Sequence, residues 1–129
     1  MESRTVDVTI ARPPDEVYEY LAIPENFPKW SFFLTAAKRD GDACLFETPN
    51  GPVHVRFATR NIHRVLDHWV TVGGEPAIYV PLRVIENSGE STVLFTVFRQ
   101  PEMSDQDYDA DIAAVRKDLD NLKRVLECA

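Results

Sequence analysis

The sequence predicts an α+β fold, in which a bent, seven-stranded antiparallel sheet wraps around one long C-terminal helix. Two observations support this prediction. Short segments of alternating hydrophobicity follow one another through the chain and are separated by turn residues. A single apolar stripe at helical spacing then occupies the end of the sequence. With 129 residues, 44% of them hydrophobic, the chain is expected to form one domain that spans residues 1–129.

The N-terminal segment predicts a strand followed by two short helices. In Thr5–Ile10, the apolar residues Val6, Val8 and Ile10 alternate with polar ones and therefore share one face, which is typical of a strand with one buried side. The sequence PPDEVYEYLA then places acidic residues behind prolines, where a helix start favours them. Its apolar side is formed by Val17, Tyr18 and Leu21. A proline ends this helix, and PENFPKW can hold only a short second turn before Trp30.

The middle of the chain predicts six further strands that form a meander. The turns between them contain Asp-Gly, Asn-Gly, Gly-Gly and Ser-Gly pairs, which tolerate positive φ angles. Because most of these connections are short, neighbouring strands are expected to pair antiparallel. The six predicted strands are Phe32–Arg39, Ala43–Thr48, Val53–Phe57, His63–Val72, Ala77–Glu86 and Thr92–Arg99.

Ser104 is expected to open the long C-terminal helix. Ser104 and Asp107, three residues later, fit a capping box, and the acidic first turn complements the positive end of the helix dipole. The apolar residues of this segment step by three or four positions and therefore share one face. They are Tyr108, Ile112, Val115, Leu119, Leu122 and Leu126. We expect this face to pack against the sheet, although the same stripe could also join two chains.

Charge and cysteine content limit the classes of function. The formal net charge of −7 repels phosphate backbones and anionic lipid, which argues against nucleic-acid binding and electrostatic membrane docking. The sequence has no apolar run long enough for membrane insertion and no signal-peptide pattern, so a cytoplasmic location is expected. Cys44 and Cys128 are expected to be separate, reduced thiols. A monomer and a homodimer paired through Thr5–Ile10 are both compatible with the sequence.

The order of these elements resembles the START-like superfamily, also called SRPBCC, whose members share the helix-grip fold. The resemblance is carried by VDVTIARPPDEVYEYLAIPENFPKW, by VLDHWV, and by YVPLRVIENSGESTVLFTVFRQPEMSD with the closing VRKDLDNLKRVLE. These stretches are similar to bacterial members of the polyketide cyclase/dehydrase-like or lipid-transport-like type. The resemblance covers nearly the whole chain.

The resemblance implies a cavity between the sheet and the C-terminal helix that accepts a hydrophobic small molecule, lipid- or polyketide-like, without a cofactor. The apolar side chains of this chain could line such a cavity or fill it. The candidate ligand-binding residues are His68, Trp30, Phe57, Tyr79, Phe95, Tyr108, Ile112 and Val115. Two alternatives stay open. One is a cyclase/dehydrase-type enzyme in which His68, with Tyr79 or Arg83, moves protons. The other is a co-chaperone-like module that binds protein through the outer face of the sheet.

The neighbours Asp67 and His68 raise the question of a catalytic dyad. Successive residues of a strand point to opposite faces of the sheet, so these two side chains cannot hydrogen-bond each other there. His68 shares its face with aliphatic residues and is expected to point inward, where burial would lower its pKa. No metal site is expected, because the three histidines have no cysteine or carboxylate at ligand spacing.

Overall fold

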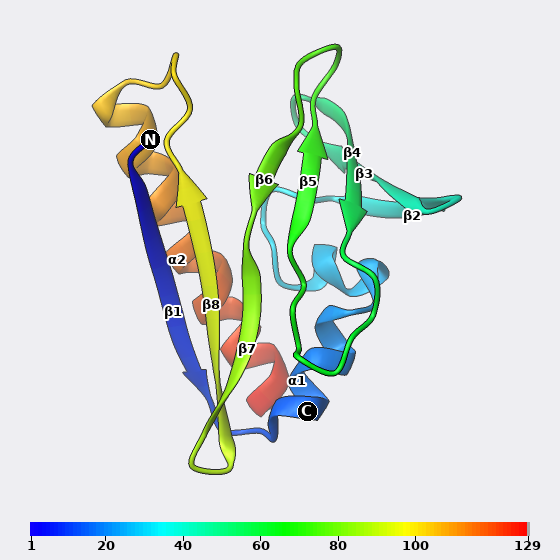
Figure 1. The fold of residues 1–129 in the computed structure, drawn as a ribbon, viewed down its shortest axis with the longest axis vertical. Coiled ribbons are helices and arrows are strands. Elements are labelled where there is room, and N and C mark those ends of the chain that lie inside the picture. Colours follow the sequence, from blue (N-terminus) through cyan, green and yellow to red (C-terminus); the bar gives the residue numbers. More distant parts are fainter. Residues whose placement is uncertain (129) are drawn as a thin grey trace.

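The computed structural model describes residues 1–128, which form two antiparallel sheets and a long helix (Figure 1). The smaller sheet has the strand order β1-β8-β7, and the larger has the order β2-β3-β4-β5-β6. The strands are β1 (Ser3–Ile10), β2 (Ala36–Asp40), β3 (Ala43–Thr48), β4 (Gly51–Phe57), β5 (His68–Thr71), β6 (Ile78–Val80), β7 (Leu82–Asn87) and β8 (Glu90–Phe98). The helices are α1 (Pro14–Leu21), the 3-10 helix η1 (Pro24–Lys29) and α2 (Asp105–Glu127).

The prediction of an α+β fold with antiparallel strands and a long C-terminal helix is confirmed, but the single seven-stranded sheet is wrong. The predicted strand Ala77–Glu86 is two strands, β6 and β7, which belong to different sheets. Pro81 lies between them and has no N–H group to donate to a ladder. Its carbonyl oxygen accepts a hydrogen bond from Thr96 N (3.0 Å) in β8. The chain therefore changes its pairing partner from β5 to β8 at this proline.

The predicted strand Phe32–Arg39 begins only at Ala36. Thr35 N still donates to Glu47 O in β3 (2.9 Å), whereas Ser31 and Phe32 are bound by α2 instead of by a neighbouring strand. Asp118 in α2 accepts hydrogen bonds from Ser31 Oγ (3.0 Å) and from Phe32 N (3.1 Å). Asp118, which is distant in the sequence, thus accepts the hydrogen bond from the Phe32 N–H group that would otherwise pair with a neighbouring strand.

The predicted strand His63–Val72 is reduced to the four residues of β5. Residues 58–67 form a connecting loop that the side chain of Asn61 holds together. Asn61 Oδ1 accepts hydrogen bonds from His63 N (3.0 Å) and Val65 N (3.1 Å), and its Nδ2 donates to Val65 O (2.9 Å). Arg64 in this loop has a φ of 58°, which is uncommon for a residue other than glycine. An asparagine-centred turn therefore replaces the first half of the expected strand.

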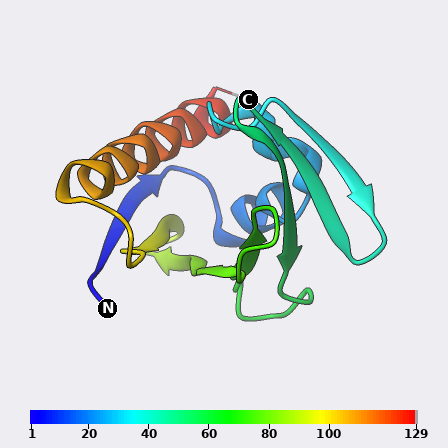
Figure 2. The same ribbon diagram turned by 90° about the horizontal axis from the view of Figure 1, so that it is seen from above.

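The helix α2 begins with the predicted cap, because Ser104 Oγ accepts a hydrogen bond from Asp107 N (3.0 Å). Its apolar stripe is buried unevenly. Leu119 is fully buried, whereas Ile112 and Val115 pack against the core but remain partly exposed. Seen from above, α2 and β1 lie on one side of the fold and β2 to β4 lie on the other (Figure 2).

Side chains of α2 also bind the open edge of β1. Arg116 Nη1 donates to Asp7 O (2.6 Å), and Lys123 Nζ donates to Thr9 O (2.7 Å). Backbone groups of odd-numbered residues in β1 point away from its partner β8, because alternate residues form the antiparallel ladder. A homodimer paired through the predicted edge strand Thr5–Ile10 would therefore have to displace these α2 side chains.

Candidate functional site

His68 lies at the centre of a buried aromatic cluster. Its side chain is 6% exposed. The ring centroids of Phe57, Phe27 and Phe95 lie 5.1, 6.3 and 6.3 Å from its own. These rings come from β4, η1 and β8, while β5 carries the histidine. Through Phe27 the cluster reaches Trp30, whose ring centroid is 5.0 Å away from that of Phe27. Four elements that are distant in sequence thus meet at one imidazole.

The two ring nitrogens of His68 have different environments. Nδ1 lies 3.0 Å from the carbonyl oxygen of Leu66, and because a carbonyl oxygen only accepts, the neutral ring carries its proton on Nδ1. Within residues 1–128, Nε2 makes no hydrogen bond. Burial lowers the pKa of His68 to about 4, so the ring is neutral at pH 7. The cluster therefore contains one unpaired hydrogen-bond acceptor, His68 Nε2, among apolar rings.

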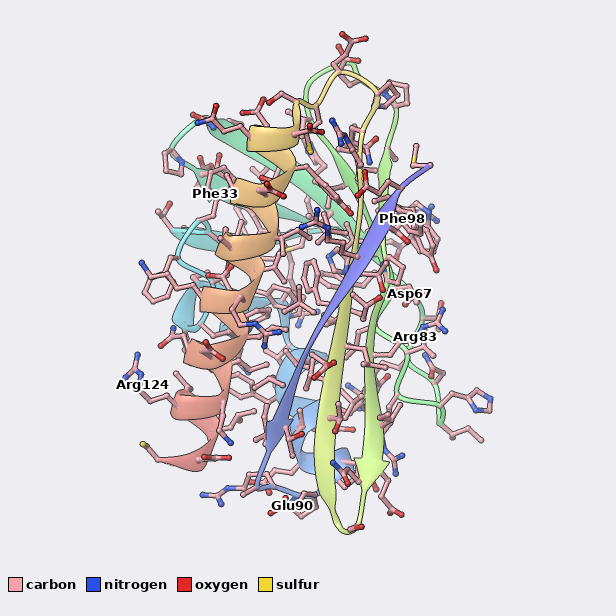
Figure 3. The ribbon with its side chains drawn as sticks, turned by 90° about the vertical axis from the view of Figure 1, so that its left-hand side faces the viewer. Phe33, Asp67, Arg83, Glu90, Phe98 and Arg124 are labelled. Carbon is pink, nitrogen blue, oxygen red and sulfur yellow. The ribbon has the colours of Figure 1, made fainter. Side chains whose placement is uncertain are left out.

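Asp67 does not pair with His68, as the alternation of strand residues predicts. Its carboxylate accepts hydrogen bonds from Tyr79 OH (2.5 Å), Leu82 N (3.1 Å) and Arg83 Nη2 (2.9 Å). Burial raises the pKa of Asp67, but these hydrogen bonds outweigh burial and lower its pKa overall. Asp67 and Arg83 lie near each other on the outer side of the sheet, away from Phe33 beside α2 (Figure 3). Asp67 therefore links Tyr79 in β6 with Leu82 and Arg83 in β7, the two strands between which the chain passes from one sheet to the other.

Two of the aromatic residues expected to line a cavity, Tyr79 and Tyr108, lie outside this cluster. Tyr79 lies on the outer face, where its ring is stacked between those of Trp69 (centroids 5.3 Å apart) and Phe98 (6.0 Å). Tyr108 is buried at the start of α2, and its hydroxyl donates to Val97 O (2.8 Å). Both phenols already have hydrogen-bond partners, which makes them poor candidates for contacting a ligand.

Apolar side chains near the core keep part of their surface accessible. The expected residues Phe57, Phe95, Ile112 and Val115 pack against the buried core and are themselves only half-buried. The same is true of Val70 in β5, two residues after His68. These side chains come from β4, β5, β8 and α2. Since all of them keep accessible surface, the apolar interior of the fold is not fully closed.

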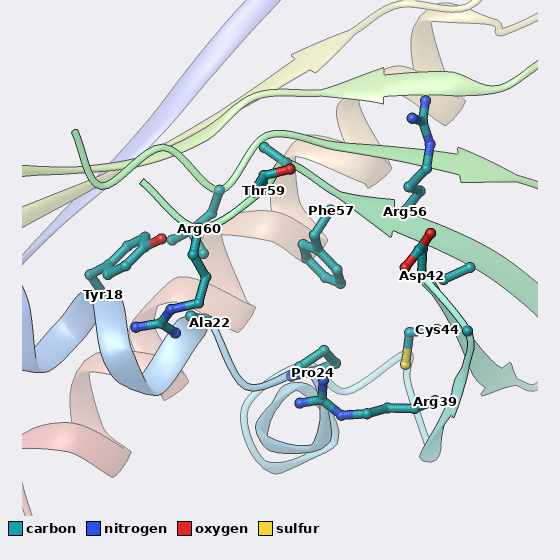
Figure 4. Close-up of a pocket in the computed structure, with 14 residues that line it drawn as sticks. Tyr18, Ala22, Pro24, Arg39, Asp42, Cys44, Arg56, Phe57, Thr59 and Arg60 are labelled. Carbon is teal, nitrogen blue, oxygen red and sulfur yellow. The ribbon is translucent and has the colours of Figure 1, made fainter. Parts of the chain in front are cut away.

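The pockets described on this molecule do not coincide with the expected cavity between the sheet and α2. One, with a volume of about 580 Å³, lies between α1, η1, the β2–β3 hairpin and the residues after β4 (Figure 4). Phe57 and Leu66, which contact His68, form part of its wall. The other, of about 380 Å³, lies on the outer face between Tyr79, Arg83 and Phe98. No residue of α2 lines either pocket.

Leu66 was expected on the same face of the strand as His68, but the sequence did not predict Phe27 as a neighbour of His68. Phe27 lies in the short PENFPK turn, where no periodicity marks a buried face. The available signal was an aromatic residue in a short segment between Pro24 and Pro28. Among residues 1–128, no group of three or more His, Cys, Asp or Glu side chains could hold a metal ion, and no helix is long and apolar enough to span a membrane.

Comparison with known proteins supports the fold. The protein XoxI from Bacillus cereus superposes with a TM-score of 0.80 at 18% identity, over 97% of this chain and 95% of that chain. The Aha1 dimer protein from Colwellia psychrerythraea gives 0.78 at 16% identity, over 98% and 97%. The di-domain ARO/CYC BexL from the BE-7585A biosynthetic pathway gives 0.80 at 18% identity, over 98% of this chain and 47% of BexL.

These likenesses show that the chain has the helix-grip architecture that the resemblance in the sequence predicts. The chain spans about half the length of BexL. No protein-family model matches the chain, and no curated protein matches it. At these identities the comparisons establish the fold and leave the activity to be argued from the site.

Proposed function

We propose that this protein binds a hydrophobic small molecule, lipid- or polyketide-like, against the aromatic cluster around His68. The observation that carries the proposal is the buried, neutral imidazole with an unpaired acceptor nitrogen among apolar rings. Small-molecule sites are mostly apolar and contain a few polar groups that fix orientation. A ligand hydroxyl would donate a hydrogen bond to His68 Nε2, while Phe57 and Phe95 would contact its apolar body.

Binding is favoured over catalysis for two reasons. A general base works best when its pKa lies near the operating pH, whereas burial lowers the pKa of His68 to about 4. The residues that the sequence suggested as its proton-transfer partners, Tyr79 and Arg83, are bonded to Asp67 on the outer face. The likeness to the ARO/CYC protein BexL is one of fold, and function is a property of the site.

The proposal is tested in an NMR chemical-shift titration with two naphthalenes, 2-naphthol, which carries a hydroxyl donor, and 2-methoxynaphthalene, in which a methyl group replaces the donor hydrogen. Wild-type protein should bind the naphthol more tightly, by roughly two- to tenfold, since a net hydrogen bond contributes about 0.5–1.5 kcal/mol. His68→Leu should remove this preference and still bind both probes. His63→Leu changes an exposed histidine outside the cluster and should retain the preference.

Two results would contradict the proposed function. The first is a folded His68→Leu protein that keeps the wild-type preference for the naphthol. The second is the absence of shifts at Phe95 and Val70, on the strands beside His68, when either naphthalene is added.

A further inference from the structure

The pocket of about 580 Å³ lies within the size range of small-molecule sites, which occupy roughly 300–1,000 Å³. Its apolar lining comes from Tyr18, Ala22 and Pro24 on the α1–η1 side and from Phe57 and Leu66 on the sheet side. The ring of Phe57 points into the middle of the pocket, opposite Pro24 (Figure 4). A flat apolar molecule would therefore have a surface to contact on two sides.

Two arginines line the same pocket and keep hydrogen-bond donors that are not in use. Arg60 binds Glu19 through Nη2, and within residues 1–128 its Nε and Nη1 groups make no hydrogen bond. Arg39 binds Glu25 through Nε (2.7 Å) and Nη2 (3.0 Å), which leaves its Nη1 group. Both ion pairs are exposed at the surface, so they are weak and readily shared with a third charge.

The remaining charged residues of the lining, Arg56 and Asp42, form no hydrogen bond or ion pair with Arg60 or Arg39 within residues 1–128. Arg56 directs its side chain away from the pocket, and its guanidinium lies 5.1 Å from the centre of the Trp69 ring. Asp42 lies across the pocket, on the other side of Phe57 from Arg60 (Figure 4). A ligand with one anionic end would therefore place that end toward Arg60 and Arg39 and its apolar body against Phe57.

From this arrangement we infer that the pocket is a second binding site, and that its ligand is an amphipathic anion: a flat apolar body that carries one carboxylate. The carboxylate pairs with Arg60 and Arg39, whose planar guanidinium groups match its geometry. Since the chain has a formal net charge of −7, an anion is repelled by the protein as a whole and is held only where such cations gather. A neutral or cationic molecule of the same shape would gain nothing from the arginines.

This site is separate from the cluster of the proposed function. Phe57 and Leu66 form the partition between them, because both line the pocket and both contact His68 from its other side. The inference does not rest on a hydrogen bond to His68, and His68→Leu should leave binding in the pocket unchanged.

The test is an NMR titration with 2-naphthoate and with its neutral counterpart 2-naphthalenemethanol. Judged from the amides of Gly41, Ala58 and Thr59, which belong to the pocket lining, naphthoate should bind more tightly than the alcohol. The alcohol carries a hydroxyl donor and can also bind at His68, so its shifts at Phe95 and Val70 are not counted. Arg60→Gln and Arg39→Gln should each weaken naphthoate binding roughly two- to fivefold, as expected for exposed ion pairs. The double variant should bind the acid and the alcohol equally, and raising the ionic strength should weaken binding of the acid alone.

Arg4→Gln is the matched control, because it removes an exposed arginine that pairs with Asp109 on another part of the surface. This variant should bind naphthoate as wild type does. The inference is overturned if wild-type protein binds both probes equally, if the double variant still prefers the acid, or if the naphthoate shifts appear at Phe95 and Val70 instead. Loss of naphthoate binding in His68→Leu would also overturn it, because it would place the anion in the His68 cluster.

Discussion

Replacement of His68 by leucine should alter how the stability of the protein depends on pH. The pKa of this histidine falls from 6.5 to about 4 when the chain folds, because burial disfavours the charged ring. Below pH 6.5 the unfolded chain takes up a proton at this position, while the folded protein does so only near pH 4. Above pH 6.5 the ring is neutral in both states, so this histidine does not lower the free energy of unfolding. As the pH falls from 6.5 to 4, the folded state progressively loses stability.

The size of this loss follows from the shift. A change from 6.5 to about 4 corresponds to a total of about 3 kcal/mol, because each pKa unit is worth about 1.4 kcal/mol. At pH 5, the unfolded state is almost fully protonated at His68 and the folded state is mostly neutral. The loss relative to pH 7.5 is then about 2 kcal/mol.

Urea unfolding, followed by tryptophan fluorescence between pH 7.5 and pH 5, measures this effect. The stability of wild-type protein should fall by about 2 kcal/mol more than that of His68→Leu over this range, since all other titrating groups are common to both proteins. Val70→Ala, an apolar change on the same strand, should keep the wild-type pH dependence. Curves for wild type and His68→Leu that remain parallel would refute the account of His68 as a buried, neutral ring.

Three further changes test the packing and the polar contacts by urea unfolding. Leu119→Ala should lower the free energy of unfolding by about 2–5 kcal/mol because the side chain is fully buried; a loss below about 1 kcal/mol would show a loosely packed α2. Asp67→Asn should cost about 1–3 kcal/mol at pH 7, since Tyr79 and Arg83 lose their acceptor. The folded pKa of Asp67 lies below 3.8, so its contribution is present above pH 3.8 and lost as the pH falls further; a deficit that persists unchanged in stronger acid would contradict this. Ser104→Ala should cost about 1 kcal/mol and speed amide exchange at Asp107, and unchanged exchange would show that the cap is dispensable.

Elements with local causes were predictable from the sequence. The start of α2 depends on Ser104 and a backbone group three residues away, and its stripe depends only on spacing. The turn between β7 and β8 needs two residues with positive φ, which Ser88 (52°) and Gly89 (85°) supply. In each case the residues that determine the structure are neighbours in the chain.

Features that depend on distant residues were not predictable. The late start of β2 requires Asp118, which lies more than eighty positions along the chain from the backbone group it binds. The division of the sheet at Pro81 was visible as a proline in a strand pattern, but its outcome depended on the bond from Thr96. For the candidate site, alternation placed His68 inside, whereas the contact with Phe27 came from packing between η1 and β5.

The binding of α2 side chains to β1 has a consequence for the order of folding during synthesis. The residues of β1 pair with those of β8, with Ser3 opposite Phe98, and the other edge of β1 is bound by Arg116 and Lys123. Both partners leave the ribosome long after β1 itself. The nascent chain therefore carries β1 without a partner strand until β8 has emerged, and with one open edge until α2 has emerged. Such an edge is a site at which chains can join incorrectly. When α2 docks, Arg116 and Lys123 bind the edge of β1 that β8 leaves open, and neither edge of the strand is then available to another chain.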